Sequence, residues 1–100
     1  MPSVKLTEIH DLGKPEAERR LREKFGHALA QFEGQVTDVT EQWNDGQLEF
    51  GFRVMGMKIS GNVAVGDSAV HLTAELPMAA MLFKGTIESR LRAELAQVLA

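Results

Sequence analysis

Residues 48–76 read LEFGFRVMGMKISGNVAVGDSAVHLTAEL, and apolar and polar residues alternate along most of this segment. A period of two is typical of a strand that buries one face. Gly56 and the pair Gly66-Asp67 interrupt the alternation where tight turns can form. The segment therefore predicts three consecutive antiparallel strands, with apolar side chains on one face of the sheet and polar side chains on the other.

Two further strands flank this segment in the sequence. Residues 44–46, Asn-Asp-Gly, are a strong hairpin signal, because an Asp-Gly pair accepts the positive φ angles of a two-residue turn. Residues 39–43 alternate weakly before that turn and predict the strand that enters it. Residues 4–9 predict a short additional strand, which ends before Gly13.

Two helices are predicted by apolar residues at steps of three and four. The first begins near Pro15, can end at Gly34, and has a face made of Ala17, Leu21, Phe25, Ala28, Leu29 and Phe32. Its other face has possible i,i+4 ion pairs between Glu16 and Arg20, Glu18 and Arg22, and Arg19 and Glu23. The second begins at Pro77, and its core stripe is Ala80, Phe83, Ile87, Leu91, Leu95 and Val98.

The predicted order is β-α-β-β-β-β-α, which favours a single two-layer α+β domain over residues 1–100. Its antiparallel sheet is covered on one face by two helices. The arrangement is similar to an abbreviated helix-grip domain, in which a sheet curls around a long C-terminal helix. A chain of 100 residues with 44% hydrophobic content suits one compact domain.

Composition and charge argue against several classes of function. No cysteine is present, so disulfides and thiolate chemistry are excluded. The net charge is −3, and residues 36–75 contain six acidic and two basic side chains, which disfavours binding to nucleic acid or anionic lipid. The longest apolar run has eight residues, far below the ~20 of a membrane span, and the N-terminus has no signal core. We therefore expect a soluble, cytoplasmic protein.

No catalytic or metal-binding motif stands out. His10, His27 and His71 have no spacing that places two of them on one face, so we expect neither a metal site nor a cofactor. The serines lie in no Gly-x-Ser-x-Gly setting. Since the predicted interior offers no acid, base or nucleophile, an enzyme acting on acyl chains ranks lowest. His10, beside a glycine turn, could hold its loop by hydrogen bonding.

The start of the last helix has more apolar residues than its core stripe requires. Met78, Met81 and Leu82 fall off that stripe. They are either buried where the helix meets the preceding strand, or exposed as a contact site that could bind a partner or form a homodimer. Gly85 disfavours a helix by about 1 kcal/mol relative to alanine, and a close approach of its backbone to the sheet or the first helix is the expected reason.

The sequence resembles a known family through an early loop motif, the position of Trp43 before its Asp-Gly turn, and a segment near the last helix. The residues that carry the two motifs are His10, Leu12 and Gly13, then Lys84, Gly85, Thr86, Ile87 and Glu88. They are similar to the polyhydroxyalkanoic acid system proteins, encoded in bacterial gene regions for polyhydroxyalkanoate storage granules. This chain departs from the pattern at residues 55–57, Met-Gly-Met, and at Asp11 and Lys14.

The resemblance implies a role at the polymer granule or in its metabolism, and it supplies no catalytic residues. Our first hypothesis is a non-enzymatic accessory protein that contacts the granule surface or a granule protein through Met78, Met81 and Leu82. The alternative is a small carrier that holds an apolar acyl ligand between the sheet and the last helix. That ligand cavity would be lined by Phe50, Phe52, Phe83 and Ile87.

Overall fold

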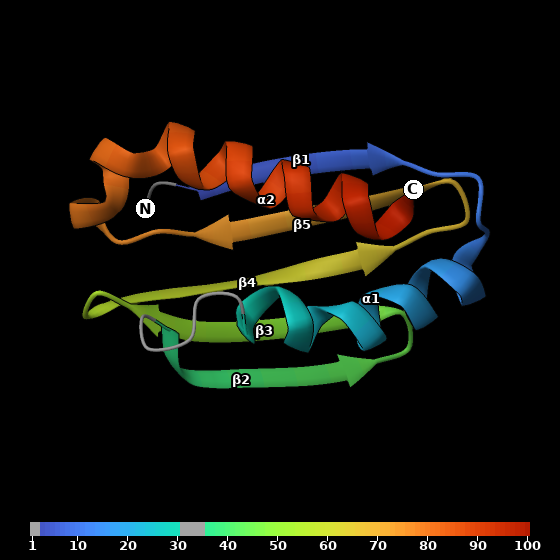
Figure 1. Ribbon diagram of the computed structural model, residues 1–100, viewed down its shortest axis with the longest axis horizontal. Coiled ribbons are helices and arrows are strands. Elements are labelled where there is room, and N and C mark those ends of the chain that lie inside the picture. Colours follow the sequence, from blue (N-terminus) through green and yellow to red (C-terminus); the bar gives the residue numbers. More distant parts are fainter. Residues whose placement is uncertain (1–2, 31–35) are drawn as a thin grey trace.

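The computed structural model describes residues 3–30 and 36–100, except for the side chains of residues 28–30, and confirms the predicted order of elements (Figure 1). The strands are β1 Ser3–Ile9, β2 Val36–Asn44, β3 Gln47–Val54, β4 Met57–Val65 and β5 Ala69–Glu75. The helices are α1 Lys14–Ala30, the 3₁₀-helix η1 Met78–Phe83, and α2 Lys84–Leu99.

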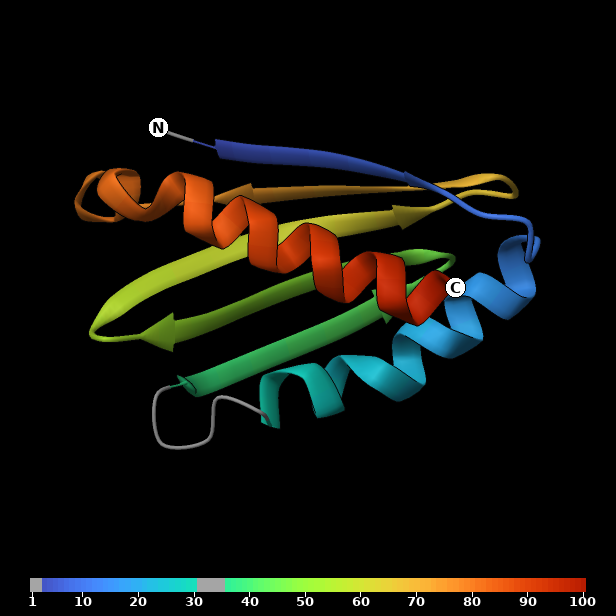
Figure 2. The same cartoon turned by 45° about the horizontal axis from the view of Figure 1, so that its top comes forward.

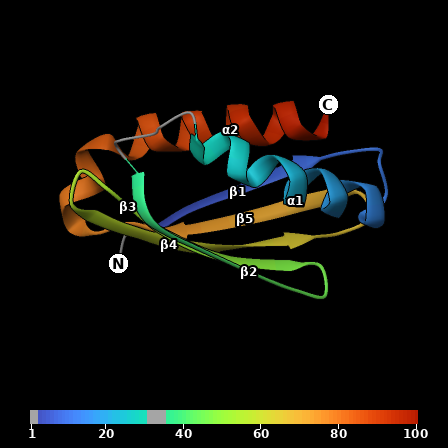
Figure 3. The same ribbon diagram turned by 60° about the horizontal axis from the view of Figure 1, so that its bottom comes forward.

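All five strands form one antiparallel sheet with the order β1-β5-β4-β3-β2. The pairing aligns Leu6 with Leu72, Leu72 with Val63, and Val63 with Leu48. Since opposed residues in a sheet point to the same face, these pairs form an apolar row across four strands. Figures 2 and 3 show that α1 and α2 both lie on one side of the sheet. The structure is the predicted two-layer α+β arrangement.

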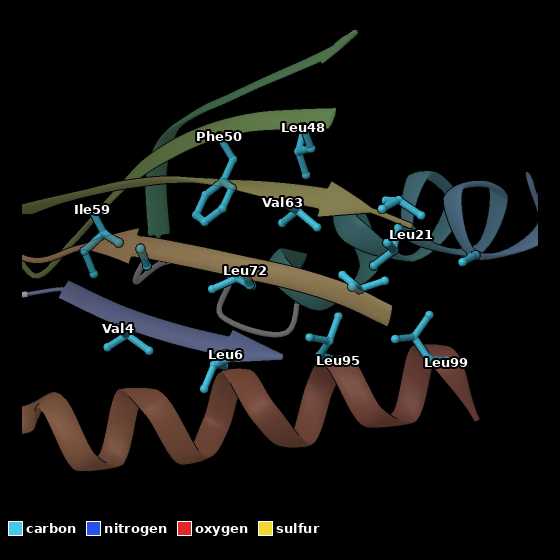
Figure 4. Close-up of a cluster of buried hydrophobic side chains, with 14 of the residues drawn as sticks. Val4, Leu6, Leu21, Leu48, Phe50, Ile59, Val63, Leu72, Leu95 and Leu99 are labelled. Carbon is cyan, nitrogen blue, oxygen red and sulfur yellow. The ribbon is translucent and has the colours of Figure 1, made fainter. Parts of the chain in front are cut away.

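The core lies between the apolar face of the sheet and the two helices (Figure 4). From the helices, Ala17, Leu21, Leu95 and Leu99 are buried, and half-buried Ile87 and Leu91 pack against them and the strands. The buried residues of the strands and their connections are Val4, Leu6, Leu48, Phe50, Ile59, Val63, Val65, Val70, Leu72, Ala74 and Leu76.

The first helix begins one residue earlier than expected, so Pro15 is its second residue. Buried Ala17 and Leu21 and half-buried Phe25 confirm the first part of its predicted apolar face. The remaining predicted positions lie outside the described residues or side chains: Ala28, Leu29, Phe32 and Gly34.

The prediction of one continuous helix from Pro77 is wrong. Residues 78–83 form η1, and α2 begins at Lys84. At the junction, Phe83 has φ −107° and ψ 9°, which is not helical geometry and changes the direction of the chain. A helical wheel drawn through Phe83 therefore fails, and this residue is 52% exposed instead of lying in the core stripe.

Candidate functional site

The short helix η1 presents most of its apolar side chains to solvent. Ala80 is fully buried, which anchors the segment to the domain, and its N–H donates to the Pro77 carbonyl oxygen at 2.9 Å within the first turn of η1. Around it, Met78 is 72% exposed, Met81 48% and Leu82 91%. The predicted alternative of burial all round is therefore wrong. Met78, Met81, Leu82 and Phe83 form an exposed surface that we call the apolar turn.

The hairpin between β3 and β4 adds a fifth exposed apolar side chain at the same end of the molecule. Met55 in this hairpin is 80% exposed. Ser60 of β4 pairs with Glu75 of β5, so the start of β4 and the end of β5 share one edge of the sheet. The three views agree, since the β3–β4 hairpin and η1 lie at the same end (Figures 1, 2 and 3). We call Met55 and the apolar turn together the apolar end.

The described charged residues beside the apolar end are balanced in sign. They are the cations Arg53, Lys58 and Lys84, and the anions Asp38, Glu75 and Glu88. The Arg53 guanidinium lies 3.3 Å from a carboxylate oxygen of Asp38. The Glu88 carboxylate lies 3.4 Å from the Arg92 guanidinium, one turn along α2. The charges of these described residues therefore provide no net cationic field for attracting an anionic surface.

The four residues proposed for a ligand cavity differ in their burial and in what they contact. Phe50 is 6% exposed, and its ring packs against Phe25 at a centroid distance of 5.8 Å and against Phe52 at 6.2 Å. Ile87 is half-buried against the core, whereas Phe83 points outward from the η1–α2 junction. Two open hollows lie elsewhere on the described surface, one beside Gly85 and Ala93 and one between α1 and α2.

The His10 motif holds two loops together. His10 is 5% exposed, and its Nδ1 accepts from the Leu12 N–H at 3.1 Å. The opposite ring nitrogen, Nε2, lies 3.0 Å from the Gly66 carbonyl oxygen and donates to it when it carries the proton. Gly13 follows with φ 80°, a conformation that favours glycine. The predicted hydrogen bonding of this loop is confirmed, and it joins the β1–α1 connection to the β4–β5 turn.

The second motif, residues 84–88, forms the first turn of α2. Lys84, Ile87 and Glu88 are half-buried, and Gly85 and Thr86 are exposed. A Cβ at Gly85 would meet nothing within 4 Å, so the expected close approach of its backbone to the sheet or to α1 is wrong. The glycine instead leaves open space on the outer side of α2, next to the apolar turn.

Neither a metal-binding cluster nor a membrane-spanning helix is found among the described residues. Within residues 3–30 and 36–100, no three histidine, aspartate or glutamate side chains are placed to hold a metal ion. In the same part of the chain, no helix is both long and apolar enough to cross a bilayer. Of the other histidines, His71 on the polar face of the sheet has its Nδ1 3.0 Å from Thr7 Oγ1. The exposed side chains of the apolar turn offer a surface for hydrophobic contact.

A protein-family model described as "Putative polyhydroxyalkanoic acid system protein" matches residues 4–99. The chain belongs to this family. The match covers both motifs, all of the sheet except its first residue, and the apolar end, so the resemblance noted in the sequence is confirmed. The family name links its members to the polyhydroxyalkanoate system. No curated protein matches the chain.

Among solved structures, the chain is similar to the TTHA0849 protein of Thermus thermophilus. The sequences are 12% identical, the alignment covers 98% of this chain and 92% of the other, and the TM-score is 0.45.

Sequence reasoning identified the methionines and Leu82 of the apolar turn, but missed Phe83 and Met55. Phe83 was assigned to the core because the helical wheel assumed an unbroken helix. Met55 was noted only as a departure from the family pattern. The sequence does contain a signal for Met55, because this methionine precedes a glycine at a tight hairpin turn, where asparagine or aspartate is favoured.

Proposed function

We propose that this protein is a non-enzymatic accessory protein of polyhydroxyalkanoate storage that acts in the cytoplasm. It contacts the storage granule, or a protein on the granule, through the apolar turn. The observation that carries the proposal is the exposure of Met78, Met81, Leu82 and Phe83 around a buried Ala80. Membership of a polyhydroxyalkanoic acid system family supplies the setting in which an apolar surface is available.

Hydrophobic burial is sufficient to drive such a contact. Covering a leucine or methionine side chain contributes about 1.5–3 kcal/mol when it passes from full exposure to full burial. Leu82 is 91% exposed and Met78 72%, so both can contribute most of this free energy on contact. Methionine side chains also adapt to irregular surfaces, because they are unbranched and polarizable.

Co-sedimentation with isolated granules tests the proposal. We expect wild-type protein in the granule pellet and Met78→Glu/Leu82→Glu in the supernatant, since two carboxylates would have to be desolvated on contact. The matched control is Ile9→Glu/Ser68→Glu, which adds the same charge at exposed positions of the opposite end. Equal recovery of wild type and Met78→Glu/Leu82→Glu in the pellet would contradict the proposal.

A homodimer through the apolar turn is the competing explanation of the same exposure. Light scattering of the wild type and of Met78→Glu/Leu82→Glu separates the two. A monomeric wild type supports an external partner, whereas a dimer that dissociates in the variant assigns the surface to self-association. The acyl carrier, with a ligand held between the sheet and α2, stays a prediction.

A further inference from the structure

Two hairpin turns of the sheet have the same backbone geometry but different residues at the first central position. In the β2–β3 turn, Asp45 has φ 48° and Gly46 φ 77°. In the β3–β4 turn, Met55 has φ 55° and Gly56 φ 79°. Both are two-residue turns with positive φ at each central residue, for which Asn-Gly and Asp-Gly are the favoured sequences. Asp45 follows this preference and Met55 does not.

Methionine at this position is unfavourable in two respects. The left-handed backbone conformation brings Cβ too close to the following carbonyl oxygen, and asparagine or aspartate can offset this by local hydrogen bonding, which methionine lacks. The side chain is also 80% exposed, so core packing does not compensate for the strain. A strained residue with an exposed apolar side chain points to a contact outside the domain.

The position of Met55 identifies the contact it would share. Its turn and η1 project from the same end of the sheet (Figures 1 and 3). Within the described part of the chain, the other exposed large apolar residues are Val39, further along β2, and Ile9, at the end of β1. A surface that approaches this end along the long axis of the molecule can therefore meet Met55 and the apolar turn together.

Charge and size argue for the kind of surface. The described flanking charges are three cations and three anions, so an uncharged surface fits better than an anionic lipid headgroup layer. A stable protein–protein interface uses about 20–30 residues a side. The apolar end offers five large apolar side chains, which is a small set for such an interface and fits contact with a continuous apolar surface better than a dimer interface.

We infer that Met55 belongs to the same contact site as the apolar turn, and that this site binds the uncharged polyester itself. In this contact, the β3–β4 turn and η1 face the polymer surface together. This inference rests on the proposed function and narrows it from a granule component to the polymer. The polar face of the sheet and α1 remain in water in this orientation.

The test uses particles of polyhydroxyalkanoate prepared without protein, so that granule proteins cannot serve as the partner. Met55→Asn gives the turn its preferred residue, and we expect Tm to rise by about 4 °C. Adsorption should nevertheless weaken about tenfold, because one mostly exposed methionine no longer reaches the polymer. The matched control Asp45→Asn, at the equivalent turn of the other end, should adsorb like the wild type.

A transposed variant, Met55→Asn/Asp45→Met, distinguishes position from general hydrophobicity. It places a methionine at the same turn position at the opposite end, and we expect it to adsorb as weakly as Met55→Asn. If Met55→Asn or Met55→Asn/Asp45→Met adsorbs to the polymer as strongly as the wild type, the inference is overturned. Binding of the wild type to anionic lipid vesicles in place of the polymer would also overturn it. If Met55→Asn dissociates a dimer, a second copy is the occupant and the inference is wrong.

The two proposals fail separately. Loss of binding in Met78→Glu/Leu82→Glu together with unchanged binding in Met55→Asn would leave the proposed function standing and remove Met55 from the site. Binding of the wild type to granules but not to protein-free particles would also keep the proposed function, and it would assign the contact to a granule protein.

Discussion

Gly61 and Gly85 both lie inside regular elements, but only Gly61 is required by packing. A Cβ at Gly61 in β4 would overlap the Thr73 carbonyl oxygen, and would lie 2.8 Å from Ala74 Cα and 3.0 Å from the Phe50 ring. Two of these atoms belong to the backbone of β5 and cannot move without disturbing the sheet. At Gly85 the same Cβ would meet no atom within 4 Å.

This difference predicts opposite effects for the same substitution. Gly61→Ala should lower the free energy of unfolding by about 3 kcal/mol, because the added methyl group forces the strands apart. Gly85→Ala should raise it by up to about 1 kcal/mol, because alanine favours the helix and the space is open. Urea unfolding followed by circular dichroism measures both. Equal stability of Gly61→Ala and the wild type would contradict the packing described for β4 and β5.

At the scale of single residues, the sequence predicted which side chains face the core better than it predicted local backbone geometry. Alternation correctly placed Leu48 and Phe50 on the buried face. It could not reveal that Phe83 has φ −107° or that Met55 has φ 55°, because one peptide unit leaves no periodic signal. The bond from His10 to the Gly66 carbonyl was equally inaccessible, since the two are 56 residues apart.

The charged face of α1 is a network rather than a set of isolated pairs. The Arg19 guanidinium lies 2.7 Å from Glu16 and 2.8 Å from Glu23, and the Arg20 side chain lies 3.2 Å from Glu16. The three predicted i,i+4 pairs are all present, the third joining Glu18 and Arg22 at 3.3 Å. The contact between Glu16 and Arg19, three residues apart, was not predicted.

Hydrogen bonds from Arg19, and then from Arg20, lower the pKa of Glu16 to about 2, from 4.5. Between these two values the unfolded chain binds a proton that the folded chain does not, so stability rises with pH in this window. The contribution of Glu16 is therefore fully present above about pH 4.5 and is lost as the pH falls towards 2.

We predict that Glu16→Gln reduces the acid sensitivity of folding. The free energy of unfolding of the variant should depend less steeply on pH between 4.5 and 2 than that of the wild type, because the variant lacks this ionisation. Urea denaturation at several pH values in this range measures the slope. The difference should shrink in about 1 M salt, since Arg19 is 60% exposed and its interaction is screened. Parallel slopes at low salt would contradict the assignment.

At the scale of elements, hydrophobic periodicity was sufficient to predict the order of strands and helices. Period two marked the four-strand meander, and spacing of three and four marked α1 and most of α2. Two features needed the structure. The pairing of β1 with β5 joins segments that are more than 50 residues apart in the chain, and local sequence carries no record of it. The separation of η1 from α2 depends on a single junction residue, Phe83.

The whole molecule has chemically different ends. Met55, Met78 and Met81 are exposed at the apolar end, whereas Met57 is half-buried against the core next to them. The opposite end carries the His10 loop and the β4–β5 turn, and its one exposed large apolar residue within the described part of the chain is Ile9. This asymmetry implies a preferred orientation on an apolar surface, because the apolar end has more exposed apolar area to bury on contact than the opposite end.

Methionine oxidation should reveal that orientation directly in the unmodified protein. In solution, dilute peroxide should convert Met55, Met78 and Met81 to sulfoxides faster than Met57, because reaction follows exposure. On protein-free polyhydroxyalkanoate particles, the three exposed methionines should be protected several-fold, whereas the rate at Met57 should change little. Tandem mass spectrometry resolves each residue. Protection of Met78 and Met81 without Met55 would mean a tilted contact through η1 alone, and unchanged rates at all three would exclude the apolar end as the contact surface.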